Sequence, residues 1–423
     1  MRISIRKLNV NDIAFVFLVY CGIALVATYM FRLPKVFTYS IDVFNIVLFL
    51  YCLYHKNFKI SKYRNRSLKV IFVCLLISIS VGYFLNVQSV ALLLWGARNN
   101  YRGVLFMFTC ISLMKVRQKE EAICFFEKIF WIHVVLVLYQ YFVLGNTGDY
   151  IGGIFGIAQG GNSGNNLILC IASTIALWRY LRKECNLTNL LIKLGCCFAV
   201  AAVSELKFYF AEIFIIVGLL LSLSDGVSRK VKAIAALICA LIVGLYLLYT
   251  IFPQWIGYFT IEHFMELLDG GRNLGGRTID RFSSLPELYR IFYSGKGSKI
   301  LFGYGLGSAD YSLAYEFLKS PIYLNYYFTG YSQLSYAFLF IELGVIGSIL
   351  YLLLIIAPII SGLKRKDEYC PITVVVGVLC LLLIFYDVTM KIEPQYFAFF
   401  LLSMPFWNEE DCENNLRNKV RIE

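Results

Sequence analysis

Residues 336–360, YAFLFIELGVIGSILYLLLIIAPII, form an apolar run with a single charged residue, Glu342. A helix needs about 20 apolar residues to cross the hydrocarbon core of a bilayer. Backbone polar groups cannot stay unpaired in lipid, so a spanning segment of this kind is helical. The run therefore predicts a transmembrane helix, and it is the pattern to look for in the rest of the chain.

Similar runs recur along the 423 residues, of which 59% are apolar and 16% are charged. A soluble globule could not hide that much hydrocarbon from water. No linker rich in Pro or Gly separates two halves, so we interpret residues 1–423 as a single integral-membrane domain. We predict an all-α polytopic membrane protein with about twelve transmembrane helices, roughly at residues 13–31, 37–54, 69–87, 99–114, 122–144, 164–181, 187–204, 209–224, 231–251, 332–360, 371–389 and 394–407.

Lysine and arginine indicate the orientation, because cytoplasmic loops contain them in excess. With alternating spans, the side that includes residues 1–12 holds 26 of the 39 Lys and Arg residues. Residues 1–12 look like a signal n-region, but no small-residue cleavage site follows, so we interpret residues 13–31 as a retained first helix. Both termini are then cytoplasmic. One long extracytoplasmic loop, residues 253–330 between spans nine and ten, is expected to contain short helices.

The net charge of +12 mostly reflects this topology and attraction to anionic lipid heads, so nucleic-acid binding is not predicted. All 13 cysteines fall in predicted spans or inner segments, which excludes a disulfide-stapled outer domain. The chain has no C-x-x-C pair, and its three histidines are far apart in sequence, so neither a metal site nor a cofactor is predicted.

The predicted outer loop contains the sequence GGRNLGGRTIDRF at residues 270–282. The guanidinium group binds phosphate oxygens in pairs and keeps its charge, so clustered arginines at a membrane face favour a lipid-linked pyrophosphate. The alternative is that these arginines pair with Asp269, Asp280 and Glu287 or contact lipid heads. The candidate cluster contains Arg272, Arg277, Arg281 and Arg290, with Arg98 and Arg102 at the mouth of the fourth span.

Charges inside the membrane cost about 2.5–3.5 kcal/mol each, so each needs a partner or a function. The candidates are Glu205, Lys207 and Glu212 near the turn between spans seven and eight, Glu342, and Asp387, Lys391 and Glu393 after span eleven. The alternative is internal pairing that only locks helices together, for instance Asp387 with Lys391. His263, the only histidine on the predicted outer side, is either a general base or an ordinary polar surface residue.

Several segments occur in an order that resembles the O-antigen polymerase and O-antigen ligase superfamily of bacterial surface-polysaccharide assembly. They are GGIFGIAQGGNSGNNLILCIAS (152–173), SELKFYFAEIF (204–214), GRTIDRF (276–282) followed by ILFGYGLGS (300–308), and YSQLSYAFLFIELGVIGSILY (331–351). Ligases of this group carry histidine and asparagine where this chain has Gln333 and Leu334, so the resemblance favours a polymerase.

The resemblance implies a membrane glycosyltransferase that polymerises undecaprenyl-diphosphate-linked oligosaccharide repeat units at the outer face of the bacterial cytoplasmic membrane. Its partners are that lipid-linked oligosaccharide and the bilayer, with a chain-length regulator and a flippase as further candidates. An O-antigen ligase, a flippase or transporter of lipid-linked oligosaccharides, and a non-catalytic scaffold are the alternatives. The expected catalytic residues are Arg277, Arg281, Asp280, Glu205 and His263, and the expected substrate-binding residues are Arg98, Arg102, Lys207, Arg272, Arg290, Tyr304, Gln333 and Tyr336.

Overall fold

The protein is helical, and the residues that the structure describes contain no β-strand. The computed structural model describes residues 12–55, 66–224, 227–251, 253, 279, 284–295, 297–365 and 367–408. The long helices of the first part are α1 (Ile13–Tyr29), α2 (Val36–His55), α3 (Arg66–Asn86), α4 (Val90–Leu113), α5 (Lys119–Phe142), α6 (Asn162–Leu181), α7 (Leu187–Val203), α8 (Tyr209–Leu223) and α9 (Val227–Ile251). After them come the short α11 (Ser284–Leu288), α12 (Gly297–Phe302) and α13 (Pro321–Tyr326), and then α14 (Ser335–Arg365), α15 (Cys370–Tyr386) and α16 (Gln395–Ser403).

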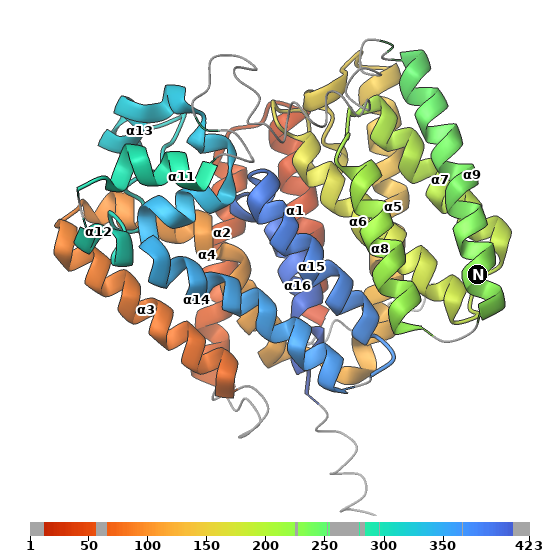
Figure 1. Cartoon of the computed structure of the whole chain (residues 1–423), viewed down its shortest axis with the longest axis horizontal. Coiled ribbons are helices and arrows are strands. Elements are labelled where there is room, and N and C mark those ends of the chain that lie inside the picture. Colours follow the sequence, from red (N-terminus) through yellow and green to blue (C-terminus); the bar gives the residue numbers. More distant parts are fainter. Residues whose placement is uncertain are drawn as a thin grey trace, which may run out of the picture.

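A row of four helices crosses the centre of the molecule, with α4, α16, α15 and α6 packed in that order (Figure 1). Helices α2, α3 and α14 lie on the α4 side, and α5, α7, α8 and α9 lie on the α6 side (Figure 1). The short helices α11, α12 and α13 gather at one end of the α4 side (Figure 1). The two sides therefore meet along α15 and α16.

The helices differ sharply in how much of their surface is buried. Nearly the whole circumference of α4 and α6 is buried, including the polar pairs Asn99–Asn100 and Asn165–Asn166. In α3, by contrast, Val73 and Ile77 are more than half exposed. Large exposed apolar faces on outer helices and polar groups on inner helices are what a lipid environment favours.

Within the described ranges, five helical segments are long and apolar enough to cross a membrane, namely Val36–His55, Arg66–Asn86, Val116–Phe142, Arg229–Leu247 and Ser335–Arg365. The apolar helices Ile13–Tyr29, Leu187–Val203, Tyr209–Leu223, Cys370–Tyr386 and Gln395–Phe406 are shorter. Helices α4 and α6 belong to neither group because polar residues dilute their hydropathy. A helix overlaps each of the twelve predicted stretches. The crossing of the membrane by all twelve stays a prediction.

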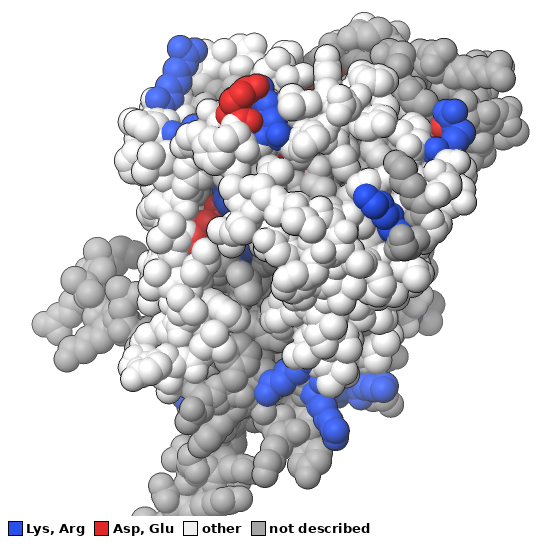
Figure 2. Space-filling model, turned by 90° about the vertical axis from the view of Figure 1, so that its left-hand side faces the viewer, with Lys and Arg blue, Asp and Glu red and all other residues white. Residues whose placement is uncertain are grey.

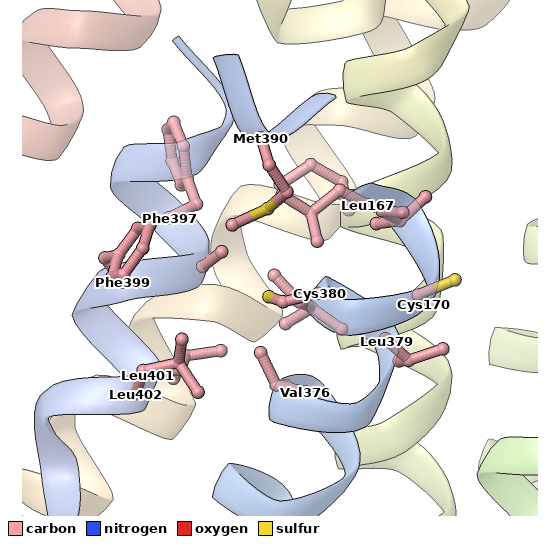
Figure 3. Packing of buried hydrophobic residues seen from close by; sticks show 14 of the residues in the cluster. Leu167, Cys170, Val376, Leu379, Cys380, Met390, Phe397, Phe399, Leu401 and Leu402 are labelled. Carbon is pink, nitrogen blue, oxygen red and sulfur yellow. The ribbon is translucent and has the colours of Figure 1, made fainter. Parts of the chain in front are cut away.

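The apolar core lies where α6, α15 and α16 meet (Figure 3). Leu167 and Cys170 of α6, Cys380 of α15 and Leu401 of α16 are at most 2% exposed. Each fully buried side chain of this size contributes about 1.5–3 kcal/mol relative to exposure to water. Close packing here fixes the connection between α15 and α16, which carries polar residues at one end of the bundle.

Candidate functional site

Three predicted site segments converge on the connection between α15 and α16, residues 387–394. The ring of Phe208, next to Lys207, stacks on Tyr386 at a centroid distance of 3.8 Å. The ring of Tyr336 stacks on Phe385 at 5.3 Å. On the other side of the connection, Glu393 forms an ion pair with Arg102 at 2.6 Å. Residues far apart in sequence are thereby gathered around one short segment.

Two arginines and two carboxylates form the first part of a buried cluster around α4. Arg98 Nε lies 2.6 Å from Asp42 Oδ2, and Arg102 Nη1 lies 2.6 Å from Glu393 Oε1. Each guanidinium group also lies near the other carboxylate, with Arg98 at 3.9 Å from Glu393 and Arg102 at 3.7 Å from Asp42. Tyr396 donates a hydrogen bond to the remaining Asp42 oxygen at 2.7 Å. Two cations thus face two anions, an arrangement that offsets much of the cost of burying them.

The cluster continues toward α14 through Asn99 and Asn100. Asn99 donates to Asp310 at 3.1 Å, and Lys391 lies 3.0 Å from the same Asp310 oxygen. Asn100 donates at 3.0 Å to Glu342, which is fully buried. We call this set the α4 cluster: Asp42, Arg98, Asn99, Asn100, Arg102, Asp310, Glu342, Lys391 and Glu393.

A glycine-rich turn at residues 303–307 delivers Asp310 to this cluster. Its backbone enters between α3, α4 and α14, where the amide of Gly305 donates to the carbonyl of Glu342 at 3.0 Å. A Cβ at Gly96 would overlap the backbone of Gly307, and Gly307 itself has φ +86°. Only glycine fits both the close approach and the left-handed conformation without strain. The glycine turn therefore serves a close backbone approach to α4 within the same chain.

Electrostatics favours the ionised form of one carboxylate of the α4 cluster, that of Glu393. Burial raises the pKa of the Glu393 carboxyl, but the guanidinium groups of Arg102 and Arg98 outweigh burial and hold that pKa below its ordinary value. The side chain of Arg102 is 4% exposed, whereas that of Arg98 is 17% exposed. Arg98 is therefore the guanidinium of this pair that a ligand can reach.

Aromatic rings surround the accessible edge of Arg98. Its guanidinium carbon lies 4.6 Å from the centroid of the Trp95 ring and 5.1 Å from that of Tyr39. Tyr315 packs next to Tyr39 with a centroid distance of 6.0 Å. Figure 2, which looks at the α3 side, shows acidic and basic atoms together in a hollow of a largely uncharged face. Rings beside a cation are a common means of holding sugars and charged head groups.

A second buried polar group, the α6 cluster, consists of His133, Asn165, Asn166, Ser204 and Glu212. His133 Nε2 lies 2.8 Å from Asn165 Oδ1, and Asn165 donates to Ser204 at 2.8 Å. Asn166 donates at 2.8 Å to Glu212, which is fully buried. Within the described part of the chain, Glu212 Oε1 has no hydrogen-bond partner. This cluster packs mostly neutral groups, in contrast to the ion pairs around α4.

The other described candidates differ in how close they lie to the connection. Glu205 and Lys207 occupy the turn between α7 and α8, where Glu205 has φ +55° and its carboxylate packs against Gly148. Tyr304 donates to the carbonyl of Phe292, and Arg290 is exposed and binds Glu287 at 2.6 Å. Gln333 is exposed beside the buried Tyr336. The structure thus brings Arg98, Arg102, Lys207 and Tyr336 toward the connection but leaves Arg290 on the surface.

The loop candidates Arg272, Arg277, Asp280, Arg281 and His263 lie outside the described residues. Their convergence with the connection therefore stays a prediction.

Sequence reasoning missed two carboxylates of the α4 cluster, Asp42 and Asp310. Asp42 stands within the predicted span 37–54, so the rule that a buried charge needs a partner or a function would have identified it. Asp310 had no such signal, because only the glycine turn places it beside α4. For Lys391, internal pairing is found, but its partner is Asp310 rather than the suggested Asp387.

No protein-family model matches the chain, and no curated protein is significantly similar to it. Among the described residues, no three His, Cys, Asp or Glu side chains lie close enough to hold a metal ion. The site must therefore be interpreted from its own residues.

Proposed function

We propose that this protein polymerises oligosaccharide repeat units carried on undecaprenyl diphosphate, at the outer face of the bacterial cytoplasmic membrane. The observation that carries the proposal is that Arg102, Phe208 and Tyr336 contact residues 385–393, which are the end of α15 and the connection after it. Residues 205–208 and 333–336 belong to segments that resemble the polymerase and ligase superfamily. Residues 98–102 lie beside them. Their meeting at one end of a helical bundle supports a site that acts on a substrate held in the membrane.

In this reaction the growing chain leaves its lipid diphosphate and joins the terminal sugar of an incoming unit. Negative charge develops on the diphosphate as its glycosidic bond breaks, so cations near it lower the barrier. Arg98 and Arg102 are balanced by Asp42 and Glu393. We assign to the more accessible Arg98 the task of orienting the diphosphate, and to Arg102 the task of holding the two carboxylates beside it. We assign to Lys207, Arg272, Arg277 and Arg281 the stabilisation of the negative charge that develops on the diphosphate.

The orientation follows from the distribution of lysine and arginine, with both termini in the cytoplasm and residues 253–330 outside. The end of the bundle opposite the connection contains ion pairs such as Arg179 with Glu120 and Arg182 with Glu368. Basic residues at that end support its assignment to the cytoplasmic side. The connection 387–394 then faces outward, where lipid-linked repeat units are polymerised.

The test is an assay of purified protein with lipid-linked repeat units as the only substrate. A polymerase yields a ladder of chain lengths without other proteins. A ligase yields product only when its glycolipid acceptor is added, and a flippase reconstituted in vesicles moves substrate across the bilayer without a new bond. Either of the last two results would overturn the proposal.

Variants make the assay specific for the proposed site. We expect Arg277→Ala and Arg281→Ala each to shorten or abolish the ladder, because removing one group that stabilises transition-state charge costs about 2.7–4 kcal/mol. Arg182→Ala, at the opposite end of the bundle, is the matched control and should leave the ladder unchanged. Full polymer length in both loop variants would remove the role of the loop cluster.

A further inference from the structure

Asn166 of α6 and Glu212 of α8 form a buried pair in which two acceptor atoms have no donor. Asn166 Nδ2 donates to Glu212 Oε2 at 2.8 Å, and the two residues are 3% and 0% exposed. Glu212 Oε2 also accepts from the thiol of Cys170 at 3.2 Å. Within the described part of the chain, Glu212 Oε1 and Asn166 Oδ1 have no hydrogen-bond partner. One oxygen of the carboxyl group therefore has two donors, and the other has none.

This uneven arrangement fits a carboxylic acid better than a carboxylate. A carboxylate only accepts, so both of its oxygens need donors, whereas a protonated carboxyl group has one carbonyl acceptor and one O–H donor. With a proton on Oε1, Glu212 can donate to Asn166 Oδ1 while Oε2 still accepts from Asn166 Nδ2. The planar amide and the planar acid then share two hydrogen bonds in one ring. A single proton thereby satisfies both buried atoms that lack a partner.

The charges around Glu212 also favour its neutral form. No cation is among the described groups that act on its carboxyl group, and the carboxylate of Asp387 disfavours a second negative charge. From the packed helices α6 and α15, the thiols of Cys170 and Cys380 face it as well. The lysines and the arginine of α9 lie in its first two turns, beside the other end of α8. The positive end of the α8 dipole is a weak effect beside the cost of burying a carboxylate without a counter-ion.

The pair lies one helical turn away from two contacts with the end of α15 and the connection after it. Asn166 is three residues after Ser163, whose carbonyl accepts from Thr389 Oγ1 at 3.2 Å. Glu212 is four residues after Phe208, whose ring stacks on the last residue of α15. A helical turn contains 3.6 residues, so each contact is close to the pair along its helix. The pair therefore ties α6 to α8 near the place where both reach the connection.

We infer that Glu212 is a proton-binding site of the folded protein and that, as a neutral acid paired with Asn166, it positions the start of α8 against α6. This inference does not depend on the proposed function. The proton forms the O–H bond of the Glu212 carboxyl group and is donated to the amide oxygen of Asn166. Loss of this proton would break one of the two hydrogen bonds of the ring and would leave a buried charge facing that amide oxygen.

Infrared difference spectroscopy of the purified full-length protein at neutral pH tests the inference. The spectrum of wild type minus Glu212→Gln should contain the C=O band of a protonated carboxyl group, and the band should shift in D₂O. The amide of glutamine can form the same two hydrogen bonds, so the variant should keep its fold, with the size-exclusion profile as a check. The control Glu316→Gln, whose glutamate side chain is 82% exposed, should remove only carboxylate bands.

Carboxylate bands alone in the Glu212→Gln difference spectrum would overturn the inference, whether a cation or a buried water then satisfies Oε1. Asn166→Leu tests the pairing itself. In this variant the C=O band of Glu212 should move to a higher frequency, because the acid loses both hydrogen bonds to the amide. An unchanged band would show that Asn166 does not hold the proton in place.

The pH dependence of unfolding gives a second readout. Unfolding exposes Glu212 to water, where a glutamate carboxyl group releases its proton above about pH 4.3. The folded state then holds one proton more than the unfolded state, so the stability is present at low pH and decreases as the pH rises. From about pH 5 to about pH 7, the folding equilibrium constant of wild type should fall about tenfold per pH unit relative to Glu212→Gln. Parallel curves for the two proteins would contradict a bound proton.

Discussion

The α4 and α6 clusters are built on the same plan but hold different kinds of polar group. Each central helix carries two adjacent asparagines, Asn99–Asn100 and Asn165–Asn166. In both pairs the second asparagine donates to a fully buried glutamate on a neighbouring helix, Glu342 of α14 or Glu212 of α8.

The first asparagine of each pair makes the difference. Asn99 bonds to Arg98, Arg102 and Asp310, whereas Asn165 bonds to His133 and Ser204. The α4 cluster is therefore a network of ion pairs, in which removing any one partner leaves an uncompensated charge. The α6 cluster can lose a hydrogen bond at a smaller cost. Of these two clusters, the α4 cluster is therefore the one that contains ion pairs.

The largest effect expected from this comparison is that of Arg102→Met. The substitution leaves Asp42 and Glu393 buried without their closest cation, which costs about 3–5 kcal/mol of unfolding free energy. The measurement is thermal or denaturant unfolding of the detergent-solubilised protein. Arg182→Met, whose partners lie at the exposed opposite end, should lose less than about 1 kcal/mol. Equal losses in the two variants would contradict the view of α4 as a buried charge network.

A smaller loss is expected from Gly96→Ala. The added methyl group would overlap the backbone of Gly307, which cannot move without displacing the turn that carries Asp310. Such overpacking costs about 1–3 kcal/mol or more, which a shift of the unfolding midpoint would show. The control Gly195→Ala lies in α7 with open space around it, and it should be neutral or stabilising by up to about 1 kcal/mol. If Gly96→Ala unfolded no earlier than this control, the close approach would be wrong.

Replacing each buried glutamate by glutamine compares the two clusters directly. Glu342 accepts from Asn100 and from the amide of Ala309 at 3.3 Å, so Glu342→Gln turns one acceptor into a donor and should cost about 1–3 kcal/mol. Glu212 Oε1 has no partner among the described residues, so Glu212→Gln should cost less than about 1 kcal/mol or stabilise the fold. The test compares the unfolding midpoints of the two variants in one buffer. A larger loss of stability for Glu212→Gln than for Glu342→Gln would refute the difference between the two clusters.

The smallest effect is expected for Arg290→Ala, which tests a candidate outside both clusters. The Arg290 side chain is 66% exposed, and an exposed ion pair with Glu287 contributes at most about 1 kcal/mol. We expect no measurable change in unfolding and, because the residue lies on the surface, little change in polymer length. A large loss of polymer with normal unfolding would return Arg290 to the substrate-binding site.

The local sequence pattern predicted which segments form helices. It was less accurate for a central helix that carries polar residues. Helices α2 and α14 were evident because each apolar run is interrupted by a single charged residue, Asp42 or Glu342, and both are long and apolar enough to cross a membrane. The predicted start of the fourth span at residue 99 missed the first turns of α4, because Arg98 and its neighbours interrupt the apolar run. That interruption carries the polar residues of the α4 cluster, whose partners lie on other segments and cannot be found from a hydropathy pattern.

Pairing could not be predicted in the same way. Arg102 and Glu393 are separated by 291 positions, and Asn99 and Asp310 by 211. The suggested pair of Asp387 and Lys391 relied on closeness in sequence, whereas the glycine turn brings Asp310 to Lys391 from another part of the chain.

The sequence by itself determined that the chain is helical and that several helices are apolar enough for a bilayer, because both properties depend on residues within a single segment. Only the tertiary structure decided which charge faces which, that Arg98 is more accessible than Arg102, and that Arg102, Phe208 and Tyr336 all contact residues 385–393. The physical reason is the sequence separation over which each property acts. Hydropathy acts along one helix, whereas ion pairs and aromatic stacking depend on how helices far apart in the chain pack together.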